Sequence, residues 1–516
     1  VLLEPTPSGP HTTTLHPECG TDRHDSLSTL AHEGEPEQMA DLSHLGGESI
    51  HNDGRPWYAE MTRFHWWIFI VAALGWLFDT MDQTLFRLSR QPAITELLAA
   101  EAPKIDDSMT QEQKTEAENR HKSIIKYHSG IATAIFLAGW ATGGLIFGIL
   151  GDRWGRAKTM LITIILYSIF TGLSALSTNI WDYSFYRFLT GLGVGGEFAA
   201  GVALVSETLP NRARPVALGL LQALSGVGNI MGAVIFYLLP AKINIGTSTF
   251  FSPTGDMANW RLSMVAGMLP ALLVIAVRRR LEEPESWKQA KARAAADGPG
   301  GEEMGSIAEL FGDPRWRKNV FLGIMLAMSG VIAVWGVGFW TPELLRDILK
   351  DLPKAEQDRY VAIQDVLQQI GAIFGMLGYT WMATTFGRKP AFILSYLMSW
   401  GMATSVFLFM DELNDMYWMI PLLGFCMMTI FGGYAIYFPE LFPTRLRSTG
   451  TGFCYNVARY LAAAGPFVLG GLTVVFQDAG YTQPFRYAAV AVLCVNILGL
   501  IAINFCPETK DKSLPT

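Results

Sequence analysis

The chain is poor in cysteine and in charge. It has five cysteines in 516 residues, and 16% of its residues are charged, whereas about a quarter are charged in a typical soluble protein. Five scattered cysteines supply neither a disulfide framework nor a CxxC metal site. We therefore predict neither a disulfide-rich secreted protein nor a zinc protein, and we expect no metal and no cofactor.

The chain also lacks the surplus of basic residues that is typical of nucleic-acid binding. It carries 39 basic and 46 acidic residues, and residues 1–60 alone hold eleven acidic residues against two basic ones. The acidic balance therefore belongs to this tail, and the rest of the chain is nearly neutral. Without a basic footprint, we expect no nucleic-acid partner.

Residues 1–60 contain no apolar core of the kind that a signal peptide has. They are rich in Pro, Gly, Ser, Thr and Glu, and they hold six of the nine histidines. Because such a composition buries too little apolar surface to fold, we expect a disordered N-terminal tail. Weak metal binding or pH sensing by the histidines is the alternative role.

Long apolar runs are what the chain has in abundance. Its residues are 50% hydrophobic, and most of the runs approach or exceed the roughly 20 residues that cross a bilayer as a helix. We therefore predict an all-α membrane protein with twelve transmembrane helices. The predicted spans lie in the runs 66–78, 131–150, 160–176, 188–205, 216–239, 262–277, 320–340, 361–382, 390–410, 416–438, 449–475 and 487–505.

The distribution of lysine and arginine predicts the orientation of the spans. Basic residues gather in the short loops after the second, fourth, eighth and tenth spans and are almost absent after the third, ninth and eleventh. The loop after the seventh span is an exception, with four basic residues. Because cytoplasmic loops are the more basic ones, we expect both termini on the cytoplasmic side of the cell (inner) membrane. Residues 91–127 then form a long polar loop outside, which we expect to be partly helical.

The second half of the chain repeats the first. The sequence at 207–214, ETLPNRAR, recurs 233 residues later at 440–447 as ELFPTRLR, and the Gly-Arg pair at 155–156 recurs at 387–388. Parallel repeats of six helices are typical of transporters that bind substrate between their halves near the midplane. We expect a tail at 1–60, a six-helix bundle at 61–278, a cytoplasmic linker at 279–317, a second bundle at 318–506 and a tail at 507–516.

Several of these motifs resemble the major facilitator superfamily over about residues 60–510. The pattern GxLxDRxGRxK at 148–158 is similar to its loop between the second and third helices, and RxxxGxGxG at 187–195 is similar to its fourth-helix motif. The sequences PES at 284–286 and PETK at 507–510 resemble the domain ends of its sugar-porter branch. The helix 1 sequence FDTMD at 78–82 resembles that of the organic-acid:proton symporters. The resemblance implies the twelve-helix fold of two parallel repeats and a transport function.

The chain departs from the family pattern at three places. The second-half loop at 383–389, ATTFGRK, has no acidic residue, and the seventh span lacks the glutamine pair of sugar porters. In the helix 1 motif, Thr80 stands where the organic-acid symporters have glycine.

Ionisable residues inside a membrane are costly, so each is a functional candidate. Asp79 and Asp82 lie three residues apart on one helical face, and burial of two close carboxylates favours holding a proton. We predict proton coupling at these two aspartates, with Arg187 paired to one of them and Glu197 as a second proton site. The alternatives are a purely structural ion pair with Arg187 and a packing hydrogen bond at Glu197.

Arg459 is the candidate for binding an anion. It lies twelve residues beyond Arg447, about 18 Å along a helix and so near the midplane. A substrate carboxylate would satisfy its planar guanidinium with two hydrogen bonds, whereas the alternative is an internal ion pair with Asp79 or Asp365. Further candidates for the substrate site are Asn456, Gln364, Gln368, Trp335 and Tyr434.

A third group of charged residues is expected to latch the two halves together at the cytoplasmic side. Asp152 can face the positive N-terminal end of the eleventh span, and arginines can bind carboxylates at helix ends. A solvated loop whose basic residues only set the topology is the alternative. The predicted latch residues are Asp152, Arg153, Arg156, Glu207, Arg212, Arg388, Glu440 and Arg445.

These observations together predict a secondary active transporter, a proton-coupled symporter of a small organic anion that works by alternating access. A sugar or polyol porter is the alternative within this class, and a transport-inactive membrane receptor is the alternative outside it. No enzyme is predicted, because the spans carry no HExxH, no GxSxG and no Cys–His pair. The expected partners are the substrate, protons and the lipid bilayer, with the protein as a monomer.

Overall fold

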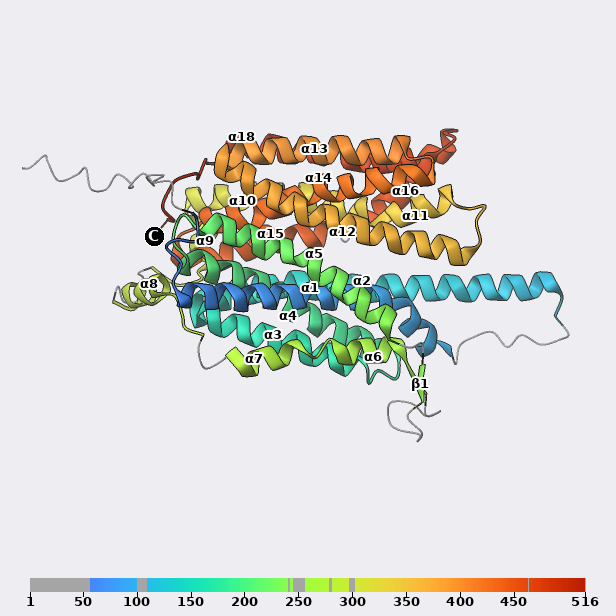
Figure 1. Cartoon of the computed structure of the whole chain (residues 1–516), viewed down its shortest axis with the longest axis horizontal. Helices are drawn as coiled ribbons and strands as arrows, with labels where there is room; N and C mark the ends of the chain where they lie inside the picture. Colours follow the sequence, from blue (N-terminus) through green and yellow to red (C-terminus); the bar gives the residue numbers. More distant parts are fainter. Residues whose placement is uncertain are drawn as a thin grey trace, which may run out of the picture. The chain divides into compact units, whose positions relative to one another are not determined.

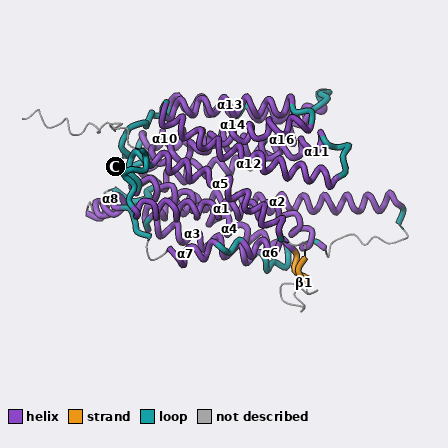
Figure 2. The backbone as a smooth tube through the Cα atoms, in the orientation of Figure 1, coloured by secondary structure: helices purple, strands orange, loops and turns teal. Residues whose placement is uncertain are grey.

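The computed structural model describes residues 56–99, 109–239, 242–244, 256–277, 281–296, 302–462 and 464–515. These residues are nearly all helical, and they belong to one compact unit, Ser49–Thr516 (Figures 1 and 2). The predictions for the tail at 1–60, including its six histidines, lie outside the described residues except for a turn at 56–60.

The first half of the described chain contains seven helices and one short hairpin. The hairpin is antiparallel, with Ile243 opposite Met257. The elements are α1 (Arg63–Leu97), α2 (Gln111–Trp154), α3 (Arg156–Ser174), α4 (Ile180–Thr208), α5 (Arg214–Leu238), β1 (Lys242–Asn244), β2 (Asp256–Ala258), α6 (Asn259–Ala266) and α7 (Pro270–Val277).

Two short helices lie in the predicted linker, α8 (Glu285–Ala296) and α9 (Ile307–Gly312). The second half then repeats the helical pattern of the first. Its elements are α10 (Pro314–Gly336), η3 (Gly338–Trp340), α11 (Thr341–Ile348), α12 (Lys354–Thr385), α13 (Arg388–Phe409), α14 (Leu413–Glu440), η4 (Thr444–Leu446), α15 (Arg447–Ala462), α16 (Gly465–Asp478), α17 (Pro484–Leu493) and α18 (Asn496–Phe505).

Ten helical segments among the described residues are long and apolar enough to cross a membrane. The other two predicted spans are each split in two, the sixth into α6 and α7 and the eleventh into α15 and α16. A proline stands at each break, Pro270 at the start of α7 and Pro466 in the first turn of α16. Proline has no N–H to continue the helical ladder, which accounts for these two breaks. The seventh span is also interrupted, between α10 and η3, and the twelfth is interrupted between α17 and α18.

The polar segment before the second span is helical. Thr110 and Gln113 form a capping box, in which the threonine hydroxyl accepts from the Gln113 N–H (3.3 Å) and the glutamine side chain accepts from the Thr110 N–H (3.0 Å). Helix α2 therefore begins twenty residues before its apolar run at 131–150, and it extends past the neighbouring helices (Figure 1). The predicted partly helical loop at 91–127 is confirmed over its described residues.

The two halves pack against each other along two pairs of long helices, α2 with α15 and α5 with α12. Glycines allow the close approach of the first pair. A Cβ added to Gly452 of α15 would overlap the carbonyl oxygen of Gly144 on α2, and a Cβ on Gly144 would overlap the Asn456 side chain. These helices bring residues from both halves to the cavity described next.

Candidate functional site

A cavity of about 170 Å³ lies between the two halves. Its walls come from α1, α2 and α5 of the first half and from α10, α12, α14 and α15 of the second. Aromatic side chains, amides and four charged groups dominate the lining. These residues are Trp76, Phe86, Phe136, Trp140, Trp335, Phe431 and Tyr455, then Gln83, Gln222, Asn229, Gln368 and Gln369, and then Arg87, Arg90, Asp365 and Arg459.

Arg459 lies between two aromatic rings at this cavity. Its guanidinium carbon is 4.0 Å from the ring centre of Trp140 and 4.1 Å from that of Tyr455, and the side chain is 3% exposed. Its Nη1 donates to the carbonyl of Tyr455 in its own helix (3.0 Å), while its Nε has no hydrogen-bond partner among the described residues. The two rings fix the orientation of the planar guanidinium through cation–π contacts. Nη1 donates the one hydrogen bond that this group makes to the described residues, so its other N–H groups can donate to a ligand.

The acids proposed as internal partners of Arg459 are engaged elsewhere. Asp365 of α12 forms an ion pair with Arg87 of α1 (3.4 Å), and Asp79 accepts from the side chain of Gln83 (3.3 Å). No ion pair of Arg459 occurs in the described part of the chain. The internal pair that the sequence left open is therefore not formed in this structure.

Three of the six predicted substrate-site residues line the cavity, namely Arg459, Gln368 and Trp335. The other three are buried away from it. Asn456 donates to the carbonyl of Gly452 (3.0 Å), and Gln364 donates to the hydroxyl of Thr341 (2.9 Å). Tyr434 donates to the carbonyl of Leu326 (2.6 Å) and lies within the second bundle.

Sequence reasoning missed several lining residues. Arg87 and Arg90 continue one face of α1 past the apolar run, so the alternating i, i+3 and i, i+4 spacing from Thr80 and Gln83 was the signal that could have revealed them. Asn229 of α5 donates to Gln369 of α12 (2.9 Å) and so bridges the halves beside the Arg87–Asp365 pair. The spacing of residues in the sequence did not indicate that the amides of Asn229 and Gln369 would form a hydrogen bond.

The predicted proton-coupling residues lie beside the cavity rather than in its wall. Asp79, Asp82, Arg187 and Glu197 are all buried within the first half, from α1 and α4. Gln83 is the link to the cavity, because it lines the cavity and donates to Asp79. Neither oxygen of Asp82 has a hydrogen-bond partner among the described residues.

The expected ion pair of Arg187 with a helix 1 aspartate is not formed at 4.0 Å or less among the described residues. The guanidinium instead donates to the hydroxyl of Ser174 from Nε (3.0 Å) and Nη2 (2.6 Å), and it lies over the ring of Phe86 (5.5 Å). Ser174 is the last residue of α3, so these hydrogen bonds connect Arg187 of α4 to the end of α3. Glu197 faces α1, where a Cβ added to Gly75 would lie 2.7 Å from its Oε1.

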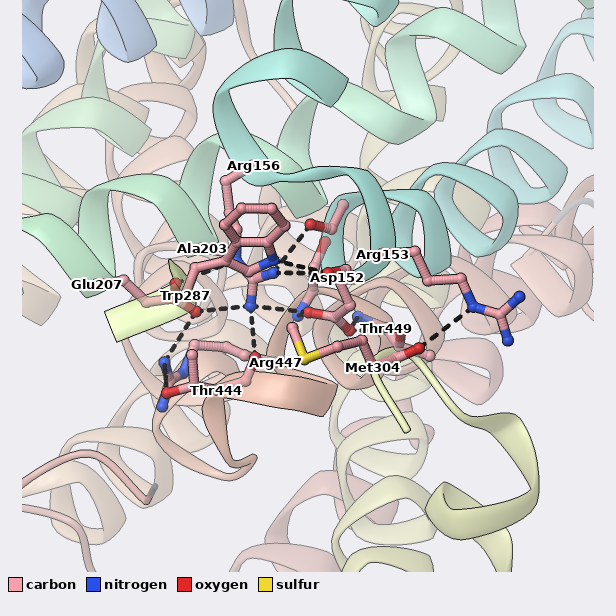
Figure 3. A network of polar contacts seen from close by, with 12 residues as sticks. Asp152, Arg153, Arg156, Ala203, Glu207, Trp287, Met304, Thr444, Arg447 and Thr449 are labelled. Atoms are coloured by element: carbon pink, nitrogen blue, oxygen red, sulfur yellow. Dashed lines mark hydrogen bonds and ion pairs between the residues drawn. The ribbon is translucent and has the colours of Figure 1, made fainter. Parts of the chain in front are cut away.

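Figure 3 shows the polar network that joins the halves at the ends of α2 and α4. Asp152 accepts from the N–H groups of Ser448 (3.2 Å) and Thr449 (2.8 Å) at the start of α15. These donors are free N–H groups of the first helical turn, where a carboxylate is stabilised by the helix dipole. Asp152 also forms an ion pair with Arg156 (2.9 Å).

Glu207 is the second carboxylate of this network. It accepts from Arg156 of its own half (2.9 Å) and from Arg447 of the other half (2.9 Å), and all three side chains are buried. Arg156 completes the bridge by donating to the carbonyl of Thr444. The residues of this network, Asp152, Arg156, Glu207, Arg447 and the start of α15, are called the latch below.

The linker contributes to the same end of the molecule. Trp287 of α8 donates its ring N–H to the carbonyl of Asp152 (2.7 Å), and Arg153 donates to the carbonyl of Met304 (3.2 Å). Arg445 pairs with Glu309 of α9 (2.6 Å) rather than with a carboxylate of the other bundle. The linker acids had not been predicted as partners.

Two of the remaining predicted latch residues pair with each other within one half. Arg388 pairs with Glu440 (2.8 Å), and both belong to the second half. Arg212 lies partly exposed in the turn between α4 and α5. The structure therefore brings three of the eight predicted residues, Asp152, Arg156 and Glu207, into the inter-half network.

The chain is similar to known transporters over most of its length. A putative metabolite transport protein of Haemophilus influenzae is 28% identical over 389 residues, which cover 73% of this chain and 86% of that protein. The cis,cis-muconate transport protein of Acinetobacter baylyi is 26% identical over 370 residues, 68% of this chain and 82% of that one. A solved structure of the proton:xylose symporter XylE with a bromodeoxyglucose has the same fold, with a TM-score of 0.67 at 18% identity, covering 87% of this chain and 98% of that chain.

The family itself is shown by a family model. The model of the Major Facilitator Superfamily matches residues 123–466, well over half of the chain. This match confirms the family resemblance, the predicted fold class and the prediction of a transporter rather than an enzyme. The chain belongs to the Major Facilitator Superfamily and is a multi-pass membrane transporter of small molecules.

Proposed function

We propose that this chain is a proton-coupled symporter of small organic carboxylates. One observation carries the proposal: Arg459 faces the cavity between the halves, held between two aromatic rings, with no carboxylate partner among the described residues. An unpaired charge inside a membrane costs at least a few kcal/mol. A substrate carboxylate would offset that cost with two charge-assisted hydrogen bonds.

Two further observations support a carboxylate. The aromatic lining suits a planar or unsaturated body beside the carboxylate, because flat rings pack against flat ligands. One relative is named as a muconate transport protein. Both support the class of ligand and leave its identity open.

Asp82 and Asp79 are the proposed proton carriers, with Arg187 and Glu197 as the groups that tune them. All four are buried in the first half, and the charges of Glu197, Asp82 and Arg459 all act on Asp79. Gln83 connects Asp79 to the cavity. Protonation of the neighbouring carboxylates and binding of an anion at Arg459 would therefore each change the electrostatic field at Asp79.

The proposed cycle is a rocking of the bundles at 61–278 and 318–506 around the cavity, with the latch opening and closing at the cytoplasmic end. Asp152, Arg156 and Glu207 would then hold the inward gate shut. We place both termini on the cytoplasmic side of the inner membrane, from the distribution of basic residues. We propose a monomer as the working unit.

A neutral polyol is the second candidate substrate. Five amide side chains line the cavity, and amides are well suited to hydroxyl groups because they both donate and accept. On this alternative Arg459 would only fix the aromatic rings, and the charge of the ligand would not matter.

Binding to the purified protein separates these two candidates. We expect a carboxylate to bind at least about tenfold more tightly than its neutral amide. Arg459→Lys keeps the charge but loses the planar fork, so it should weaken carboxylate binding, and Arg459→Gln should abolish the preference. Equal affinity for acid and amide, or unchanged acid affinity in both variants, would contradict the role of Arg459. Arg120→Gln, in the exposed part of α2, is the control for loss of one positive charge.

A further inference from the structure

The cavity contains a second arginine that the proposed function does not use. Arg90 lines it from α1, and its Nη1 donates to the hydroxyl of Thr133 on α2. Its Nε has no hydrogen-bond partner among the described residues. Its neighbour Arg87 is paired with Asp365, whereas Arg90 forms no ion pair within the described chain.

Helix α2 relates Arg90 to Arg459. Arg90 contacts Thr133, and Arg459 stacks on Trp140. These two α2 residues are seven positions apart, two turns on one face of the helix, so the two guanidinium groups lie roughly 10 Å apart along it. With about 2.8 Å for a charge-assisted hydrogen bond at each end, roughly 4 to 5 Å remains between the facing oxygens of a bridging ligand.

The wall between the two arginines is apolar and largely aromatic. Phe136 and Leu137 lie between Thr133 and Trp140 on α2, and all four residues line the cavity. The Phe136 ring packs against Phe86 (4.8 Å between ring centres) and Trp140 (5.8 Å), and Trp140 meets Trp335 of the other half (6.0 Å). The cavity therefore has an aromatic wall with one arginine at each end, Arg90 at one and Arg459 at the other.

We infer that the preferred substrate is a dicarboxylate with a short planar body, and that Arg90 receives its second carboxylate. The inference rests on the proposed function, because it takes Arg459 as the site of the first carboxylate. Two cations at opposite ends of an apolar wall match a dianion of that length, and a monocarboxylate would leave Arg90 without a short-range counter-charge.

A matched pair of ligands tests this inference on the full-length purified protein. The probes are fumarate and crotonate, which share a short planar alkene body but carry two carboxylates and one, and mesaconate and tiglate form a second such pair. We expect each diacid to bind at least about tenfold more tightly than its monoacid. Arg90→Gln should remove this preference by weakening the diacid alone, and Arg90→Lys should keep part of it because the charge remains. The matched control Arg120→Gln should leave both affinities within about twofold.

The outcomes distinguish this inference from the proposed function. If each monoacid binds as tightly as its diacid, or if Arg90→Gln changes both ligands in equal proportion, Arg90 is not a carboxylate site. Monoacid binding that is still weakened by Arg459→Gln would then leave the proposed function standing. If none of the four acids binds, both proposals are contradicted.

Discussion

The two halves carry the same loop motif, but among the contacts of the described residues only the first copy reaches across to the other half. In both copies a glycine with positive φ (Gly155 at 116° and Gly387 at 105°) precedes an arginine that pairs with the glutamate at the end of a long helix. In both copies, a glutamate that follows the last helix of the bundle accepts from backbone N–H groups in the first turn of the helix that begins after the glycine. Glu283 does so for α3 (3.0 and 3.1 Å), and Glu508 does so for α13 (2.9 and 3.0 Å).

The two copies differ at the residue that lies one helical turn before the motif arginine. Asp152 accepts from Ser448 and Thr449 of the other half, whereas Thr384, 232 residues later, donates to carbonyls of its own helix. Glu207 accepts from Arg447 across the interface, whereas Glu440 accepts from Thr509 in its own half (2.5 Å). The second copy is satisfied internally.

This difference teaches that the latch is one-sided. The first half supplies the carboxylates, Asp152 and Glu207, and the second half supplies the donors, Arg447 and the start of α15. Motif residues that are equivalent in sequence should therefore differ in function. Those of the first half should control opening, and those of the second half should stabilise the fold of their own bundle.

The largest expected difference concerns Asp152 and its counterpart. Asp152→Ala should slow substrate turnover at least about tenfold, or about 1.4 kcal/mol, because it removes the carboxylate that binds the start of α15. Substrate affinity at equilibrium should change by less than about twofold, since the loop lies far from the cavity. Thr384→Ala is the matched control and should leave turnover unchanged. A tenfold loss of affinity with normal turnover in Asp152→Ala would show that this residue belongs to binding instead.

The two glutamates provide the second comparison. Removing one partner of a buried ion pair costs about 3–5 kcal/mol, so both Glu207→Gln and Glu440→Gln should lower thermal stability. Only Glu207→Gln should open the latch. Spin labels at Lys158 and Lys318, both exposed near the start of α3 and α10, should then report a longer distance in Glu207→Gln and an unchanged one in Glu440→Gln. The same distance in both variants would mean that Glu207 does not hold the halves together.

The two glycines should instead behave alike. Their backbone conformations (φ 116°, ψ 152° and φ 105°, ψ 165°) suit glycine alone, and an added Cβ would meet Glu283 in one copy and Glu508 in the other. Gly155→Ala and Gly387→Ala should each cost about 1–3 kcal/mol of stability, measured as a fall in melting temperature. A loss in one copy only would show that the shared turn is required in just one half.

The smallest expected effect is a pH dependence at Glu508. Burial raises the pKa of this carboxyl, but the N–H groups of Lys389, Arg388, Lys510 and Thr509 outweigh burial and hold the pKa below its ordinary value of 4.5. A lowered pKa in the folded state means that the contribution to stability is present above the ordinary pKa and is lost as the pH falls through the folded one. Glu508→Gln should therefore lower the melting temperature at neutral pH, and its difference from the wild type should shrink below about pH 4.5. A difference that stays constant down to acid pH would contradict this account of the contact.

Much of the fold was predictable because the signals are local and large. Long apolar runs mark membrane helices irrespective of their neighbours, and the recurrence of Gly-Arg and of ExxPxRxR marks the repeat. The breaks at Pro270 and Pro466 were also visible as prolines inside apolar runs, although an apolar count alone treats the run as continuous. The contact of Asp152 with the start of α15 followed from the helix dipole.

The partners within the site were not predictable, because they depend on which helix faces which. The position of Arg187 inside the fourth span led us to predict an ion pair with a helix 1 aspartate, but its hydrogen bonds go to Ser174 on the helix packed beside it. The spacing of Asn456 and Arg459 places them on one helical face. The side chain of Asn456 nevertheless donates to the carbonyl of Gly452 and packs against Gly144 of α2. Arg90 became a candidate only when α1 proved to stay helical to Leu97.

Proton-driven uptake tests the central claim most directly. Proteoliposomes containing the full chain are given an inward proton gradient and the carboxylate that binds most tightly to the purified protein. The account predicts accumulation above the external concentration, loss of accumulation in Asp82→Asn, and continued exchange of preloaded substrate in that variant. Mere equilibration of the carboxylate in the wild type, or accumulation by Asp82→Asn against the substrate gradient, would contradict coupling through Asp82.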